Sequence, residues 1–335
     1  MTLFASVPSA VLPVSHAPDP AEGGSDVAQD TLRAQVRAEM EAARLSGTDV
    51  AREAGIPYGT FSAWLGGTYK GRNDEKAAQV TRWLASRRDR ARTRAALPGV
   101  RGFQDTPTSR RILTTLQFAH HTSDFAVIAT SAGLGKTTTI QHYRTLAPNV
   151  FVITCEQVST SPHAVLFDLA ETVGVVERST TRVSRAIQNR LRDAGALVVV
   201  DEAQCLPVAT LEQLRSIHDL AGCGLVLSGN QSVYSRLGNG KAEFAQLFSR
   251  IGGRHTQERP EDEDVLVLAR AWGVEGEAEV RLLRAIARKP GALRGVTKTL
   301  RRAHLIASGL EAPVTADVLK QAWANLSPEK LDLVA

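Results

Sequence analysis

The spacing of apolar and polar positions divides the chain of 335 residues into parts with different periods. Residues 1–30 have no helical period and are rich in Ala, Pro, Ser and Gly, which predicts a disordered tail. Residues 31–95 repeat apolar positions at helical spacing in four stretches, which predicts an all-helical domain. Proline and glycine at 97–102 interrupt this pattern and are typical of a linker.

From about residue 103, short apolar runs alternate with amphipathic stretches. Four runs are rich in β-branched residues and almost free of polar positions; they lie at 125–129, 150–154, 196–200 and 224–228. Strands of this kind separated by helices predict a parallel sheet that is covered by helices on both faces. We therefore expect an α/β fold with its core at residues 96–260.

After Pro260 the pattern becomes helical to the end of the chain. Four amphipathic stretches are expected as helices, at 262–272, 277–288, 291–308 and 315–326. Residues 261–335 therefore predict a separate helical lid domain that follows the core.

Charge is distributed unevenly between these parts. The whole chain has a formal net charge of +5, but residues 32–111 contain 16 basic and 8 acidic residues, whereas residues 112–335 contain 24 and 23. A basic segment joined to a near-neutral one favours a nucleic-acid-binding module, and a solvated basic helix is the alternative.

Other features of the composition exclude several classes of protein. No apolar run approaches the length that spans a membrane, and the N-terminal residues lack the charged start of a signal peptide. The three cysteines form no Cys-x-x-Cys pair, which suits a reducing compartment and argues against a zinc site. We expect a cytoplasmic protein without a membrane partner.

The strongest chemical signal is the run Thr-Ser-Ala-Gly-Leu-Gly-Lys-Thr-Thr between a predicted strand and a predicted helix. This is the setting of a loop whose backbone N–H groups bind the phosphates of a nucleotide. The pattern usually starts with glycine; Thr130 is acceptable there if its backbone is extended. The predicted nucleotide ligands are Ser131, Ala132, Gly133, Leu134, Gly135, Lys136, Thr137 and Thr138.

Side chains near this loop and after the later strands complete the chemistry. Lys136 is expected to contact the β- and γ-phosphates of ATP, and the Thr137 hydroxyl to bind Mg²⁺. Asp201 ends an apolar strand and is a second Mg²⁺ ligand, while Glu202 is placed to polarise the attacking water. Asn230 taken alone is more typical of a turn, but its position after the next strand favours a role in orienting that water.

This series of motifs, followed by a helical domain, resembles the AAA+ ATPases. Within that superfamily the short core and the sequence Asp-Glu-Ala-Gln at 201–204 are similar to the transposition ATPases of the phage Mu B type. The resemblance covers roughly residues 103–335. It implies an arginine that reaches the γ-phosphate of a neighbouring subunit, for which Arg250 is the better match and Arg254 the alternative. It also implies a lid arginine, Arg294.

Residues 46–65 resemble the helix-turn-helix of phage repressors. Ala51 permits two helices to approach, Gly55 takes the turn, and Phe61 and Trp64 anchor the second helix at about 58–65. That helix has no Arg, Asn or Gln for paired contacts to base edges, so we expect binding with little sequence preference. The predicted DNA contacts are Tyr58, Thr60, Ser62, Tyr69, Lys70 and Arg72; arginines at 82–94 can follow phosphates. Protein docking is the alternative.

Together these features predict an ATP-dependent, non-sequence-specific DNA-binding ATPase. The resemblance implies that it assembles as an oligomer or helical filament on double-stranded DNA, selects target DNA and activates a transposase, in a bacterial host cytoplasm if it is phage- or transposon-encoded. Two alternatives stay open: an ATP-switched helix-turn-helix transcription regulator, and a loader or remodelling ATPase. A basic run at 280–302 is a second DNA surface, a docking face or a solvated helix.

Overall fold

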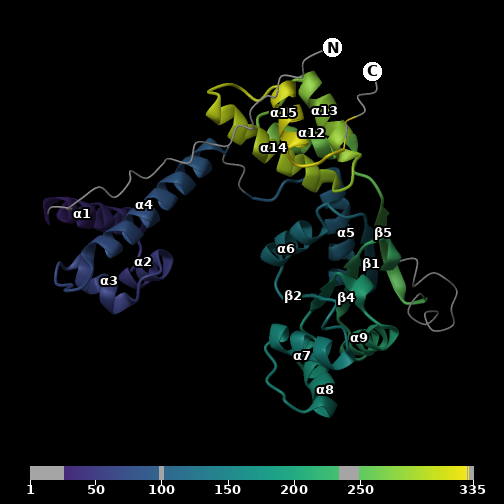
Figure 1. The fold of residues 1–335 in the computed structure, drawn as a ribbon. Helices are drawn as coiled ribbons and strands as arrows, with labels where there is room; N and C mark the ends of the chain where they lie inside the picture. The colour runs from purple at the N-terminus through teal and green to yellow at the C-terminus, as the bar shows by residue number, and fades with distance from the viewer. Residues whose placement is uncertain (1–25, 98–101, 234–248, 330, 332–335) are drawn as a thin grey trace. The chain divides into compact units, whose positions relative to one another are not determined.

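The computed structural model describes residues 26–97, 102–233, 249–329 and 331 (Figure 1). Contacts between residues divide the chain into two compact units, 1–97 and 98–335. Within the described ranges, no helix is long and apolar enough to cross a membrane.

The N-terminal unit consists of four helices around one small core. They are α1 (Asp26–Ala43), α2 (Gly47–Ala54), α3 (Tyr58–Leu65) and α4 (Asn73–Ala96). Ser46 caps α2 in a capping box with Asp49, and Gly55 ends the helix in a left-handed conformation with φ of +67°. Phe61 and Trp64 of α3 are almost fully buried. The inward anchoring of α3 therefore agrees with the expectation from its sequence.

Helix α1 begins earlier than the sequence pattern predicts. It starts at Asp26, inside the segment 1–30 that was expected as a tail, and residues 1–25 lie outside the described residues. The buried Gln29 side chain explains part of this difference, since its amide donates to Asp74 of α4 at 3.3 Å. A single polar contact to a distant helix is invisible to a count of apolar positions.

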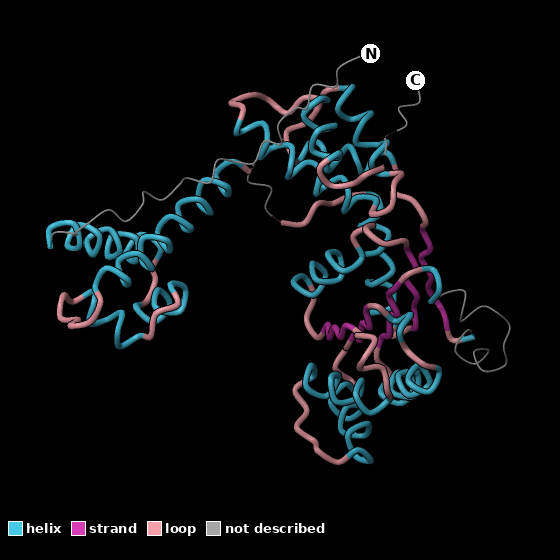
Figure 2. Tube along the Cα trace, viewed as in Figure 1, coloured by secondary structure: helices cyan, strands magenta, loops and turns pink. Residues whose placement is uncertain are grey.

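The second unit is built on a five-stranded sheet, whose strands are magenta in Figure 2. The strand order is β2-β3-β4-β1-β5, and every neighbouring pair is parallel. The strands are β1 (Phe125–Thr130), β2 (Val150–Thr154), β3 (Leu197–Asp201), β4 (Gly224–Gly229) and β5 (Ile251–Gln257). Four of them match the predicted apolar runs to within one residue at either end. The α/β class and the parallel sheet are therefore confirmed.

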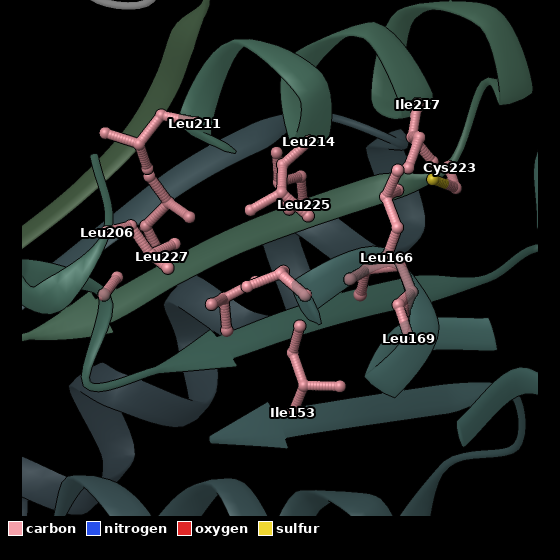
Figure 3. Close-up of a cluster of buried hydrophobic side chains, with 14 of the residues drawn as sticks. Ile153, Leu166, Leu169, Leu206, Leu211, Leu214, Ile217, Cys223, Leu225 and Leu227 are labelled. Carbon is pink, nitrogen blue, oxygen red and sulfur yellow. The ribbon is translucent and has the colours of Figure 1, made fainter. Parts of the chain in front are cut away.

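Helices cover both faces of this sheet. Helices α5 (Pro107–Thr122) and α6 (Lys136–Leu146) pack on one face, where they meet Leu197 and Val199. Helices α7 (Pro162–Val173), α8 (Thr180–Leu191) and α9 (Val208–Ala221) pack on the other, where they meet Val198 and Val200. Figure 3 shows leucines of α9 and β4 pointing toward one another in this second layer. Two buried faces explain why the strands lack polar positions.

The fifth strand was not among the predicted runs. Its sequence, Ile-Gly-Gly-Arg-His-Thr-Gln, is polar, and its residues alternate between half-buried and exposed at the edge of the sheet. Gly252 and Gly253 leave room for the side chains of Asp124 and Phe118, which a Cβ at either position would overlap or crowd. An edge strand that is packed by neighbours rather than by its own side chains has no apolar signature.

Four helices follow β5, as predicted: α12 (Asp262–Ala271), α13 (Glu277–Ala287), α14 (Ala292–Gly309) and α15 (Ala316–Ala324). Asp264 of α12 is fully buried and joins them to the core. Its carboxylate accepts from the Thr108 backbone N–H at 2.8 Å and the Thr108 hydroxyl at 2.6 Å, at the start of α5. The carboxylate thus provides an acceptor for a backbone N–H in the first turn of α5, which has none within its own helix, and it fixes the first lid helix on the core.

Candidate active site

The phosphate loop connects β1 to α6 and has the backbone geometry that anion binding requires. Gly133 and Gly135 have φ of +87° and +90°, a region that residues with a side chain rarely adopt. Gly135 is also the residue that precedes α6, so the positive end of the helix faces the loop. A Cβ at Gly133 would overlap the Gly291 carbonyl oxygen, so the lid approaches this loop closely.

Thr130, which replaces the usual first glycine, is the last residue of β1 and is fully buried. Its backbone is extended, which meets the condition set by the sequence. The substitution also supplies an acceptor: Lys136 Nζ lies 3.2 Å from Thr130 Oγ1 and 2.8 Å from its carbonyl oxygen.

Lys136 is held inside the loop with only 9% of its surface exposed. Its ammonium also donates to the Ser131 carbonyl oxygen at 3.2 Å. Burial lowers the pKa of Lys136 below its usual value, while the nearby Asp201 and Glu202 carboxylates act in the opposite direction. A buried cation whose hydrogen-bond partners are neutral carbonyl and hydroxyl oxygens is well placed to exchange them for phosphate oxygens.

Asp201 and Thr137 meet beside the phosphate loop. Thr137 Oγ1 donates to Asp201 Oδ2 at 2.7 Å, and the Ser228 hydroxyl donates to Asp201 Oδ1 at 2.9 Å. Asp201 has 1% of its surface exposed, so its carboxylate is held rigidly at the end of β3. A hydroxyl and a carboxylate are hard oxygen donors, and they fit the few protein ligands that Mg²⁺ takes next to phosphates.

Glu202, Gln204 and Asn230 form a second polar group in the same cavity. Glu202 has a left-handed backbone, with φ of +56°, and Gln204 lies on the short helix η1 (Ala203–Cys205). The Asn230 side-chain oxygen accepts from the Ser232 backbone N–H at 2.9 Å and its hydroxyl at 2.5 Å. The turn role of Asn230 is therefore present in the structure, and its orientation of water stays a prediction.

The phosphate loop from Ala132 onward, Glu202, Gln204 and Asn230 line one cavity of about 490 Å³ between the core and the lid. Its wall combines polar groups of the phosphate loop and Glu202 with the large apolar side chains of Phe103, Leu268, Trp272 and Leu293. This combination suits a nucleotide, which has a charged chain of phosphates and a flat, less polar base.

The lid contributes one face of α14 to this cavity. Arg294, Thr297 and Arg301 all line it, and their spacing of three and four residues places them on one side of the helix. The Arg294 backbone N–H donates to the Gly133 carbonyl oxygen at 3.2 Å. The structure thus brings Arg294, predicted by resemblance, to the phosphate loop.

Sequence reasoning assigned no role to several cavity residues. Gln204 stands in the Asp-Glu-Ala-Gln run at 201–204. Arg301 lies seven residues, or two helical turns, after Arg294, so helical spacing alone would place both arginines on the same face of the helix. The apolar wall comes from three separate segments, 102–104, 268–272 and 293. No local pattern links these segments.

Arg250 lies far from the phosphate loop of its own chain. It precedes β5, whose first residue pairs with Phe125 at the start of β1, whereas the loop follows the end of β1. The six residues of β1 separate the two by about 20 Å. Arg250 is exposed and lies 3.5 Å from Asp219; Arg254 is exposed within β5. Neither arginine is brought to the cavity of its own chain.

Members of the basic run at 280–302 have different surroundings. Arg281 pairs with Glu277 at 3.3 Å and Arg284 with Asp262 at 3.6 Å, two acids that lie outside the run. Arg294 and Arg301 line the nucleotide cavity instead. Pairs that are largely open to solvent add little to stability.

A parallel sheet with a phosphate loop, two carboxylates after β3 and a helical lid over one cavity defines a P-loop ATPase of the AAA+ class. Comparison with known sequences narrows this class. The chain belongs to the family of phage Mu B transposition proteins. Residues 249–326 match the family described as Mu B transposition protein, C terminal, and residues 119–237 match an AAA domain.

Two relatives show how far the similarity extends. The chain is 36% identical over 299 residues to the ATP-dependent target DNA activator B of Escherichia phage Mu, covering 88% of this chain and 95% of that protein. It is 32% identical over 275 residues to the Mu-like prophage FluMu DNA transposition protein B of Haemophilus influenzae, covering 80% and 95%.

Solved structures agree with the fold. Cdc6p from Pyrobaculum aerophilum has a TM-score of 0.51 at 14% identity over 68% of this chain and 69% of that chain. The Drosophila ORC has a TM-score of 0.50 at 19% identity over 70% and 65%. At this identity the likeness concerns the fold alone.

Proposed function

We propose that this protein is an ATP-dependent target DNA activator for transposition, which assembles on double-stranded DNA, selects it as target and activates a transposase. The observation that carries this proposal is the cavity between phosphate loop and lid. Because Arg294 and Gly133 already touch across it, ATP bound there would contact both parts and set their relative position. The named roles of its relatives, target DNA activation and DNA transposition, indicate the process in which this ATPase would act.

ATP hydrolysis in this cavity would use the residues described above. Lys136 and the loop N–H groups hold the phosphates, and Glu202 accepts a proton from the attacking water. Thr137 and Asp201 would hold Mg²⁺, which supplies charge neutralisation at the phosphates. Nucleotide binding would favour assembly on DNA, and hydrolysis would favour release.

DNA contacts are proposed on the N-terminal unit. Tyr58, Ser62 and Lys70 are exposed on or just after α3, while Thr60 and Tyr69 are half-buried. Arg72 is exposed and pairs with Glu75 at 2.6 Å, an acid that would compete with a phosphate for it. Every described side chain from 88 to 95 at the end of α4 is exposed, including four arginines. Such a surface favours phosphate contacts over base recognition.

The deciding experiment is electron microscopy of the protein with duplex DNA of mixed sequence, with and without ATP. We expect filaments or regular oligomers on DNA with ATP and far fewer without it, together with broad binding in a sequence selection. One strongly preferred sequence would instead support a transcription regulator. Unchanged DNA affinity after deletion of residues 1–95 would support a loader that uses this unit to bind a partner protein.

Assembly should also complete the active site between subunits. Arg250→Ala keeps its own phosphate loop, and Lys136→Ala keeps its Arg250, so neither variant alone should hydrolyse ATP efficiently. In an equal mixture, head-to-tail pairing gives at most about a quarter of the sites both intact parts, and fewer if Lys136→Ala joins the assembly poorly. We expect measurable hydrolysis in the mixture on DNA. The same mixture with Arg254→Ala tests the alternative arginine, and no recovery with Arg250→Ala would contradict its proposed role.

A further inference from the structure

Gln204 connects two parts of the active site that are far apart in the sequence. Its amide nitrogen donates to the Glu202 carboxylate, and its amide oxygen accepts from the backbone N–H of Asn230 at 3.2 Å. A backbone N–H can only donate, so the bond to Asn230 determines which end of the Gln204 amide faces Glu202. The NH₂ group is therefore directed at the carboxylate.

Gly229 provides the space for this arrangement. A Cβ at Gly229 would overlap the Gln204 side-chain oxygen and would lie 2.6 Å from the Val233 side chain. Gly229 is not among the residues with positive φ, so its backbone conformation does not itself require glycine. The close approach of Gln204 is a specific reason for glycine at the end of β4.

The two neighbouring acids are held in different ways. Asp201 is buried and bonded by the hydroxyls of Thr137 and Ser228. Glu202 is half-buried on a left-handed backbone, and within the described ranges the side chain that bonds its carboxylate is Gln204. A group that must face a water molecule accurately depends on such a support, since small displacements of reacting groups cost rate.

We propose that Gln204 is a positioning residue that orients Glu202 for ATP hydrolysis; this inference rests on the role of Glu202 in the proposed function. The Gln204 amide holds one carboxylate oxygen and leaves the other to accept from water. As the water oxygen bonds to the γ-phosphorus, its proton moves to Glu202 and the bond from phosphorus to the ADP oxygen breaks. Through Asn230, the same amide ties Glu202 to the end of β4.

The test compares Gln204→Ala and Gln204→Glu with the parent protein. Glutamate has nearly the same shape and can still accept from the Asn230 N–H, but its ionised carboxylate cannot donate to Glu202. We expect both variants to lower kcat at least about tenfold, with KM and ATP affinity within about twofold. Gln213→Ala is the matched control, because Gln213 is also a half-buried amide, bonded to Ser184 at 2.9 Å on the far layer of the sheet.

Double variants show whether Gln204 acts through Glu202 or only fills space beside Gly229. In single-turnover hydrolysis, Gln204→Ala should cause no further loss in a Glu202→Gln background, and Gly229→Ala should cost less in a Gln204→Ala background than alone. Normal kcat in both Gln204 variants, or a loss of ATP affinity equal to the loss of kcat, overturns the proposal. Normal hydrolysis by Glu202→Gln would instead overturn the role of Glu202 in the proposed function, and with it the reason for a residue that positions Glu202.

Discussion

Replacing Lys136 by alanine is expected to reduce ATP hydrolysis by about a thousandfold and to abolish the stimulation of DNA binding by ATP. The ammonium is the only described cation placed inside the phosphate loop, where it lies within 3.2 Å of three loop oxygens. Alanine removes the charge that would meet the β- and γ-phosphates, and the loop N–H groups alone cannot supply it. Both ATP affinity and turnover should fall.

The fold should survive this substitution. Burial already opposes the charged form of Lys136, which is why its pKa is lowered, so removing the ammonium removes an unfavourable buried charge. Alanine also removes the donor of the buried Thr130 oxygens, so the two effects oppose one another and the protein should remain folded, which its circular dichroism spectrum would check. Lys320→Ala is the control: Lys320 is exposed on α15, 3.0 Å from Asp317, and its loss should change neither hydrolysis nor assembly. Undiminished ATP-dependent assembly by Lys136→Ala would contradict the proposal that ATP binding in this cavity favours assembly on DNA.

The parts of the fold that could be predicted are those whose cause is local. Strands β1 to β4 are covered on both faces, so each is a run of apolar residues, and the lid helices have one buried face each. Strand β5 was not predicted because Gly252 and Gly253 have no side chains and pack against those of Asp124 and Phe118. The residues that determine its packing therefore lie in other segments of the chain.

The active site divides in the same way. Carboxyl ends of parallel strands meet at one edge of the sheet, so acids that follow a strand could be placed beside the phosphate loop from the sequence alone. The role of Gln204 could not, because it depends on the missing side chain at Gly229 and on the N–H of Asn230, 26 residues along the chain. For Asn230 the sequence predicts a side chain that orients water, whereas in the structure its side-chain oxygen accepts from the Ser232 backbone N–H.

Glu202→Gln should act on a different step from Lys136→Ala. Glutamine has nearly the shape of glutamate, and its oxygen can still accept from Gln204, but it cannot take a proton from water. We expect ATP affinity to change little and hydrolysis to slow by about a hundredfold to ten-thousandfold. Glu171→Gln, which changes an exposed carboxylate on α7, is the control and should hydrolyse ATP normally.

The two variants should therefore move DNA binding in opposite directions. If ATP-bound protein assembles on DNA and hydrolysis releases it, Glu202→Gln accumulates the bound state and its DNA complexes should dissociate more slowly after dilution into competitor DNA. Lys136→Ala cannot reach that state, so its complexes should be few with or without ATP. Neither variant hydrolyses ATP efficiently, but only Glu202→Gln is expected to hold it. If the lifetime of the DNA complexes changed in the same direction in both variants, DNA binding would not depend on bound ATP.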